Sequence, residues 1–314
     1  MKKTTLILLT ITLLACGNYQ QENIGLKVIQ VTEAGGVTDG SFNQDVFYGI
    51  SRFFAANPLA GSYSYVASPS HDLLEQTVRN AADENPTVLI TAGFNFIDII
   101  ARVAPLYPAI NFILVDGFVD LPNVKSIVYN EYNAGFLAGQ ITALAALRDG
   151  LESPVFATIE GMEVPAVVAY RNGFMAGIIE LIPAANFERL ALNNWTDAAT
   201  ARSFALMLRQ RHGDNLYAIK TMAGSANGGA ISFARELHQQ GERLFIVGVD
   251  TDMYAMGLVS DGHSVVLTSA LKLCNVDIYN ALHSIVDGTF TSGLTEGETG
   301  FSATNILVQG LVLP

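Results

Sequence analysis

Residues 38–45, with the sequence TDGSFNQD, bring together polar side chains that could bind an ion or a small ligand. Four of them alternate in the D-x-S-x-N-x-D spacing of a calcium loop: Asp39, Ser41, Asn43 and Asp45. An EF-hand loop also needs glycine at its sixth position and glutamate at its twelfth, and these positions hold Gln44 and Ile50. The pattern therefore argues against calcium, and we expect no bound metal.

The same stretch leads into a helical pattern, so helix capping is its first structural explanation. Asp39 or Ser41 can accept hydrogen bonds from the exposed N–H groups of the first helical turn. Capping does not account for Phe42, whose ring stands at the helix start and can project into a cleft. Asn43 beside it can both donate and accept hydrogen bonds. These two side chains are candidates for contact with a ligand.

Polar residues also follow the predicted strands. Seven short apolar runs rich in Val, Ile, Leu or Phe indicate buried strands: 26–32, 87–93, 109–117, 154–160, 215–221, 244–250 and 264–270. Helical patterns lie between them, and this alternation predicts parallel sheets with helices on both faces. Ligands of such folds bind beyond the carboxyl ends of the strands. The polar residues near those ends are Glu33, Asp116, Glu160, Asp250 and Lys272.

A glycine-rich segment, AGSANGGA at 223–230, follows the strand pattern that ends at Thr221. It lacks both the G-x-G-x-x-G fingerprint and the GK[ST] ending of a phosphate loop. Two explanations stay open: a backbone-lined edge of a ligand site, or a tight turn between a strand and a helix.

Composition narrows the class of protein. The chain has 314 residues, half of them hydrophobic, which is enough for two α/β lobes with sizeable cores. Its net charge of −12 argues against a nucleic-acid-binding protein, whose affinity comes from a basic surface. After the N-terminus, no apolar run approaches the roughly 18 residues of a membrane-spanning helix. This balance suits an exported protein that handles a small ligand.

The N-terminus has the features of an export signal. Lys2 and Lys3 precede an apolar segment that ends in Leu-Leu-Ala followed by Cys16. A small residue followed by cysteine resembles the lipobox of bacterial lipoproteins, in which the cysteine is acylated. An ordinary signal peptide with a chance cysteine is the alternative. Cys274 is the other cysteine, and its apolar helical surroundings predict a small core residue.

Several segments together resemble one family, the basic membrane protein family of bacterial substrate-binding lipoproteins. They occur in family order over most of the chain: TDGSFNQ (38–44), FILVDG (112–117), NEYNAGFLAG (130–139), IEGMEVPAVVAYRNGFMAG (159–177), VGVDTDMY (247–254) and VVLTSALK (265–272). The resemblance implies a type I periplasmic-binding-protein fold, in which two doubly wound parallel-sheet α/β lobes are joined by three crossovers around a ligand cleft. It also implies a purine nucleoside ligand, ABC permease and ATPase subunits as partners, and no cofactor.

Where the motifs match, the resemblance implies roles for individual residues. Phe42 stacks on the base, and Asn43 and Asp116 bind its edge. Asp250 and Lys272 bind the ribose. These residue types suit a nucleoside, which offers flat faces for stacking, a donor and acceptor edge, and a vicinal diol that a carboxylate and an ammonium group can bind.

Two positions depart from the family pattern. The acid after the first strand is aspartate in the family and is the longer Glu33 here. The second stacking ring is typically phenylalanine, and Trp195 stands at that place in LNNWTDA. The match is looser around 220–229, where only Gly224 is carried over as a ligand residue.

The resemblance divides the chain into a signal peptide (1–15), a lipidated cysteine with a tether (16–24), an N-terminal lobe (25–129 plus 251–270) and a C-terminal lobe (130–250 plus 271–314).

The leading hypothesis is a monomeric receptor, lipid-anchored in the cell envelope, that closes around a nucleoside and delivers it to a permease. A nucleoside-cleaving enzyme would need an N-terminal aspartate cluster for calcium, and VTEAGGVTDG supplies one Glu and one separated Asp. A sugar receptor of the same fold would need no paired rings. A surface adhesin that binds host macromolecules is a further alternative, and binding assays on whole cells would distinguish it from a nucleoside receptor.

Overall fold

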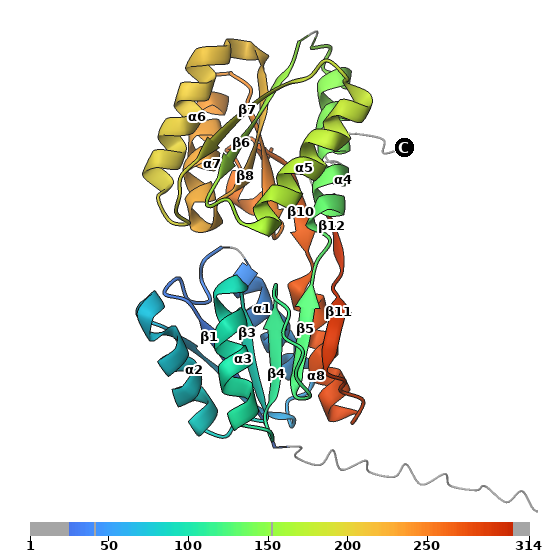
Figure 1. The fold of residues 1–314 in the computed structure, drawn as a ribbon. Helices are drawn as coiled ribbons and strands as arrows, with labels where there is room; N and C mark the ends of the chain where they lie inside the picture. The colour runs from blue at the N-terminus through green and yellow to red at the C-terminus, as the bar shows by residue number, and fades with distance from the viewer. Residues whose placement is uncertain (1–24, 41, 152, 304–314) are drawn as a thin grey trace, which may run out of the picture.

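Two α/β lobes, each built on one six-stranded sheet, make up the protein (Figure 1). The structure is a computed structural model that describes residues 25–40, 42–151 and 153–303. The predicted signal peptide, Cys16 with its tether, and Ser41 lie outside the described residues. Among the described residues, no helix combines the length and the apolar character needed to cross a membrane.

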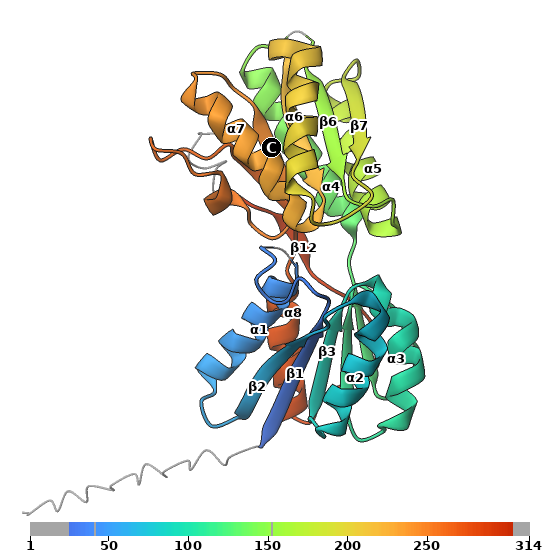
Figure 2. The ribbon, with the colours of Figure 1, turned by 90° about the vertical axis from the view of Figure 1, so that its left-hand side faces the viewer.

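The N-terminal lobe contains a fully parallel sheet. Its strands, in spatial order, are β11 (Gly293–Glu296), β5 (Val124–Val128), β4 (Asn111–Val115), β3 (Val88–Ala92), β1 (Leu26–Thr32) and β2 (Gly61–Ala67). Helices cover both faces, as Figure 2 shows: α1 (Phe42–Ala56) and α8 (Cys274–Val286) on one, α2 (Leu74–Asp83) and α3 (Ile97–Val103) on the other. Neighbouring residues of β1 pack on opposite faces of the sheet: Val28 packs with α1 and α8, and Ile29 packs with α2 and α3. Burial on both faces explains the nearly continuous apolar strands.

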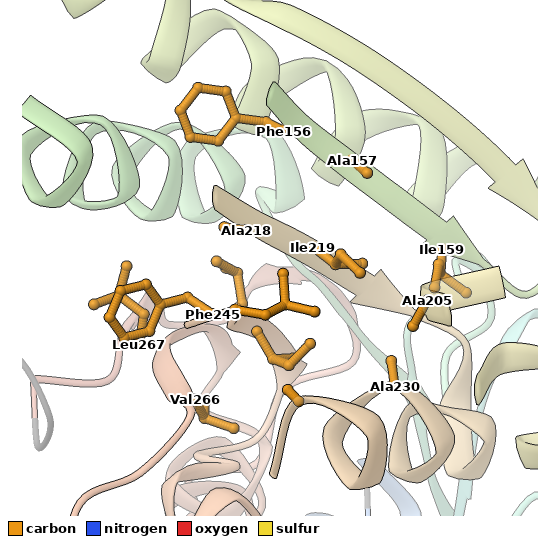
Figure 3. Packing of buried hydrophobic residues seen from close by; sticks show 14 of the residues in the cluster. Phe156, Ala157, Ile159, Ala205, Ala218, Ile219, Ala230, Phe245, Val266 and Leu267 are labelled. Carbon is orange, nitrogen blue, oxygen red and sulfur yellow. The ribbon is translucent and has the colours of Figure 1, made fainter. Parts of the chain in front are cut away.

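The C-terminal lobe repeats this arrangement. Its strands, in spatial order, are β12 (Thr299–Phe301), β10 (Val266–Lys272), β9 (Phe245–Asp250), β8 (Leu216–Met222), β6 (Val155–Glu160) and β7 (Asn186–Ala191), and β12 runs antiparallel to β10. The helices are α4 (Glu131–Arg148), α5 (Pro165–Leu181), α6 (Ala198–His212) and α7 (Asn227–Gln239). One core cluster joins them to the sheet, and Figure 3 shows part of it, with Ala205 of α6 and Ala230 of α7 near Ile159 and Ile219.

Helices α4 and α5 approach closely because glycines face the contact. A Cβ atom at Gly139 would lie 2.2 Å from the carbonyl oxygen of Phe174, and one at Gly135 would lie 2.4 Å from that of Tyr170. Any side chain at these positions would push the helices apart. The first turn of α4, which carries Glu131, is therefore held against the segment of α5 that carries Tyr170.

The chain crosses between the lobes three times: from β5 to α4, from β10 to α8, and from β11 to β12 (Figures 1 and 2). The predicted lobe boundaries are wrong in the last third of the chain. Strand β10 was expected in the N-terminal lobe, but it pairs with β9 in the C-terminal sheet. Helix α8 was expected in the C-terminal lobe, but its Cys274 and Ile278 pack against Val46 and Ile50 of α1. Two lobes with three crossovers confirm the predicted type I periplasmic-binding-protein fold.

The predicted strands are confirmed to within two residues at each end. Strand β2 was missed because all seven of its residues are exposed, so it has no buried apolar run to detect. The short strands β5, β11 and β12 were missed as well. Cys274 is fully buried, as predicted, and is a free thiol.

Candidate ligand-binding cleft

A cavity lies between the lobes at the carboxyl ends of the strands, and both lobes line it. All eight ligand residues predicted from the sequence are in its wall: Glu33, Phe42, Asn43, Asp116, Trp195, Gly224, Asp250 and Lys272. Four come from the N-terminal lobe and three from the C-terminal lobe, while Lys272 ends β10 at a crossover. The fold therefore brings these dispersed residues together at one site.

The start of α1 is held by Asp39, which confirms one of the two predicted caps. Its Oδ1 accepts from the backbone N–H of Gln44 at 3.1 Å, and its Oδ2 accepts from the backbone N–H and the Nδ2 of Asn43 at 3.2 and 3.0 Å. The Oδ1 of Asn43 is buried and has no hydrogen-bond partner among the described residues. A buried acceptor of this kind usually has a partner, so this oxygen is suited to a donor group of a ligand.

The acids of the TDGSFNQD segment do not converge on one point. Asp45 accepts from the backbone N–H and the Nδ2 of Asn275 at 2.9 and 2.8 Å, so it ties α1 to α8. In the described part of the chain, no group of three His, Cys, Asp or Glu side chains is placed to hold a metal ion. The alternating pattern is thus explained by capping and helix packing.

Aromatic rings from both lobes face the cavity. Phe42 lies against the backbone of Gly93, where an added Cβ atom would be 3.9 Å from two of its ring carbons. Phe94, the next residue, also lines the cavity and is 40% exposed. Phe94 was not predicted from the sequence, and the signal that could have found it is its position directly after a predicted strand.

Trp195 forms part of the opposite wall. Its ring lies over Gly161, where an added Cβ atom would be 2.2 Å from Cε3 and 2.4 Å from Cζ3. The carbonyl oxygen of Trp195 accepts from the backbone N–H of Ala226 at 3.1 Å and from the Ser225 hydroxyl at 3.2 Å. Gly224 precedes these residues with a φ of +56°, a left-handed conformation that glycine adopts easily. The glycine-rich segment is therefore both a tight turn and an edge of the cavity.

Asp116 and Asp250 occupy matching positions in the two lobes. Asp116 follows β4 and Asp250 ends β9, and both have left-handed backbones, with φ of +65° and +63°. Aspartate tolerates this conformation better than most residues because its short side chain can form local hydrogen bonds. The Tyr170 hydroxyl donates to Asp250 Oδ1 at 3.4 Å. Burial raises the pKa of Asp250, although the charge of Lys272 opposes this shift.

Lys272 joins the two lobes electrostatically. Its Nζ donates to both oxygens of Asp116 at 2.8 Å, and it lies 3.1 Å from Glu131 Oε1 and 4.0 Å from Asp250 Oδ1. Burial alone would lower the pKa of Lys272, but the three carboxylates raise it above its ordinary value. Burial raises the pKa of Glu131, and the charge of Lys272 opposes this. Glu131 was missed in the sequence although it lies in a motif that carried the resemblance.

Two further strand-end acids have partners within the protein. Glu33 lines the cavity, and its Oε1 accepts from Asn95 Nδ2 at 2.8 Å. Glu160 is fully buried and accepts from Arg171 at 2.8 Å and Arg189 at 2.7 Å. Glu160 is not among the residues that line the cavity, so its role is structural.

Comparison with known proteins identifies the family. A family model described as ABC transporter substrate-binding protein PnrA-like matches residues 26–302. The ABC transporter nucleoside-binding protein BmpA of Lactococcus lactis is 26% identical over 289 residues, covering 89% of this chain and 80% of that protein. An uncharacterized lipoprotein of Pyrococcus horikoshii is 25% identical over 294 residues, covering 88% of this chain and 68% of that protein.

A solved structure shares the fold. The solute-binding protein of an ABC transporter system from Aeropyrum pernix K1 superposes with a TM-score of 0.76 at 22% identity, covering 92% of this chain and 81% of that one. The two chains therefore share the two-lobed fold. Because the family model spans nearly all of the described residues, the chain belongs to the family of PnrA-like ABC transporter substrate-binding proteins.

Proposed function

We propose that this protein is a lipid-anchored receptor of an ABC importer and that it binds purine nucleosides in the cleft between its lobes. Family membership makes it a substrate-binding protein, whose partners are a ligand and the permease and ATPase subunits of a transporter. The nucleoside, the anchor and the monomeric state are the parts that we propose.

The observation that carries the nucleoside assignment is the pairing of Phe42 and Trp195. They come from different lobes and line the same cavity. Closure of the lobes around a flat base would place one ring on each of its faces. Base–aromatic stacking contributes about 1–3 kcal/mol per base in nucleic-acid-binding proteins. A sugar, in contrast, offers no flat aromatic face for either ring to stack on.

The polar groups of the cavity suit the remainder of a nucleoside. Asp250 can accept from the ribose hydroxyls, and Lys272 can donate to their oxygens. Asp116 can accept an N–H from the base, which favours guanine and hypoxanthine over adenine at N1, and pyrimidines would stack less area. The name of the Lactococcus lactis relative, a nucleoside-binding protein, supports this ligand class.

The anchor is supported by the N-terminal sequence and by one relative. Leu-Leu-Ala-Cys16 follows a basic and apolar leader, and the Pyrococcus horikoshii relative is named a lipoprotein. An acylated Cys16 would hold the receptor on the outer side of a bacterial membrane, next to its permease.

Calorimetry on ligand-stripped protein tests the ligand. Guanosine and inosine should bind at least as tightly as adenosine, and cytidine and uridine more weakly. In Asp250→Ala, guanosine should lose about 1.5–3 kcal/mol of affinity, the range for hydrogen bonds to charged groups. Wild type should bind 2′-deoxyguanosine much less tightly than guanosine. The Asp250→Ala variant should bind 2′-deoxyguanosine only slightly less tightly than guanosine.

Asp120→Ala is the matched control, because Asp120 is exposed and is not among the cavity residues. Folded, stripped protein that binds no nucleoside would refute the assignment, and glucose binding in its place would favour the sugar alternative.

A further inference from the structure

Three carboxylates lie within 4.0 Å of the buried ammonium group of Lys272. The lysine side chain is only 3% exposed. Besides the acids, three aromatic rings surround its Nζ, with centroids at 5.5–5.7 Å: those of Phe42, Tyr129 and Tyr170. Little water reaches this ammonium group, so its charge depends on the neighbouring carboxylates.

The three acids differ in what else they can contact. Asp116 and Asp250 line the cavity together with Lys272, whereas Glu131 is not among the lining residues. Glu131 stands in the first turn of α4, where Gly135 brings that helix against α5. Glu131 is thus a partner of Lys272 that is not one of the cavity-lining residues, at 3.1 Å from the ammonium nitrogen.

Lys272 and a ligand would compete for hydrogen bonds to the carboxylate of Asp116. Both of its oxygens accept from the lysine Nζ at 2.8 Å. Each oxygen keeps a second lone pair that can accept an N–H from a base, but that new hydrogen bond competes with Lys272 for the same carboxylate and weakens its hold on the ammonium group. A buried ammonium group that loses its partner is strongly destabilised, so a second carboxylate has to balance it.

We propose that Glu131 is a positioning residue that neutralises Lys272 and so frees Asp116 to accept a hydrogen bond from the base. The inference rests on the proposed function, because it concerns how the same cavity binds a nucleoside. It makes Glu131 important for bases with an N–H donor at N1, such as guanine. Adenine has an acceptor there, and an ionised carboxylate can only accept, so adenosine does not compete with Lys272 for Asp116.

The test is calorimetry of Glu131→Gln with guanosine and with adenosine. Guanosine should bind about tenfold more weakly or worse, as expected for losing a hydrogen bond to a charged group. Adenosine should weaken by less than about threefold. The matched control is Glu75→Gln, because Glu75 also lies in a first helical turn and pairs with arginines at 2.7 Å, but outside the cavity lining.

A merely structural role would weaken both nucleosides equally, and that result, or wild-type affinity for both, would overturn the inference. Glu131→Asp retains the charge on a shorter arm and should give a smaller loss, again selective for guanosine. It therefore decides the question if Glu131→Gln does not fold. Wild type that binds no nucleoside would instead overturn the proposed function, and the inference with it.

Discussion

Gly161→Ala is a way to move the Trp195 ring without removing it. Gly161 directly follows β6, and the added Cβ atom would lie 2.2 Å from Cε3, 2.4 Å from Cζ3 and 3.0 Å from the carbonyl oxygen of Asn194. Favourable carbon–carbon contacts lie near 3.5–4.0 Å. The ring therefore has to move by more than about 1 Å.

Two free energies follow from this displacement. Forcing a methyl group into a filled space typically costs about 1–3 kcal/mol of folding stability. If Trp195 stacks on the base, the misplaced ring loses much of the roughly 1–3 kcal/mol that such stacking contributes. The dissociation constant for guanosine should then rise about 5- to 150-fold.

The assay combines calorimetry with indole fluorescence. Trp195 is the only tryptophan in the chain, so every change in indole emission comes from it. Wild type titrated with guanosine should give a saturable change, and Gly161→Ala a smaller change at higher concentrations. The matched control is Gly228→Ala, since no heavy atom lies within 4 Å of the Cβ that it adds.

The double variant Gly161→Ala, Trp195→Leu separates the ring from other effects. With the ring gone, the alanine should weaken guanosine binding little further than Trp195→Leu alone. A Gly161→Ala protein that melts earlier but binds guanosine as tightly as wild type would refute the reasoning, because a displaced ring without effect on binding cannot be a wall of the ligand site.

Three other perturbations test the anchor, the buried Lys220 and the partly buried Asp277. Cys16→Ser should release the protein from membranes, and a variant that stays bound after carbonate washing would require another anchor. Lys220 is fully buried, and burial lowers its pKa to about 7. Stability is therefore lost as the pH falls from about 10.5 to 7, and Lys220→Met should raise the melting temperature more at pH 7 than at pH 10; an equal rise would contradict this. Burial raises the pKa of Asp277 to about 6, so stability is lost as the pH rises from about 4 to 6. Asp277→Asn should melt above wild type at pH 8 and close to it at pH 4, and a difference independent of pH would count against the shift.

The sequence by itself was sufficient for the two-lobed architecture, and it pointed to eight residues that the fold brings to one cavity. Buried strands such as 26–32 and 244–250 are recognisable because their residues face helices on both sides of a sheet, which leaves a local apolar run. Polar residues at the ends of such strands, such as Asp116 and Asp250, lie at the carboxyl edges of their two sheets, where ligands of such folds bind. The family motifs then named which of them to consider. All of these signals are carried by short segments.

Lobe membership was not predictable in this way. An apolar strand such as β10 fits either sheet, and only its hydrogen bonds with β9 place it in the C-terminal lobe. Helix α8 follows one residue later and belongs to the other lobe, because its apolar face completes the core beneath α1. A change of lobe within one residue leaves no trace in hydrophobic periodicity.

The charge arrangement of the cavity likewise depends on contacts between distant segments. Lys272 pairs with Asp116 across 156 positions of sequence. Glu131 joins them from the first turn of α4, a position that the sequence alone explains equally well by the favourable interaction of an acid with a helix N-terminus. The sequence shows that an acid and a lysine are available. Which carboxylate neutralises which ammonium group is decided by tertiary structure, because ionic contacts extend only a few ångströms and the fold sets those distances.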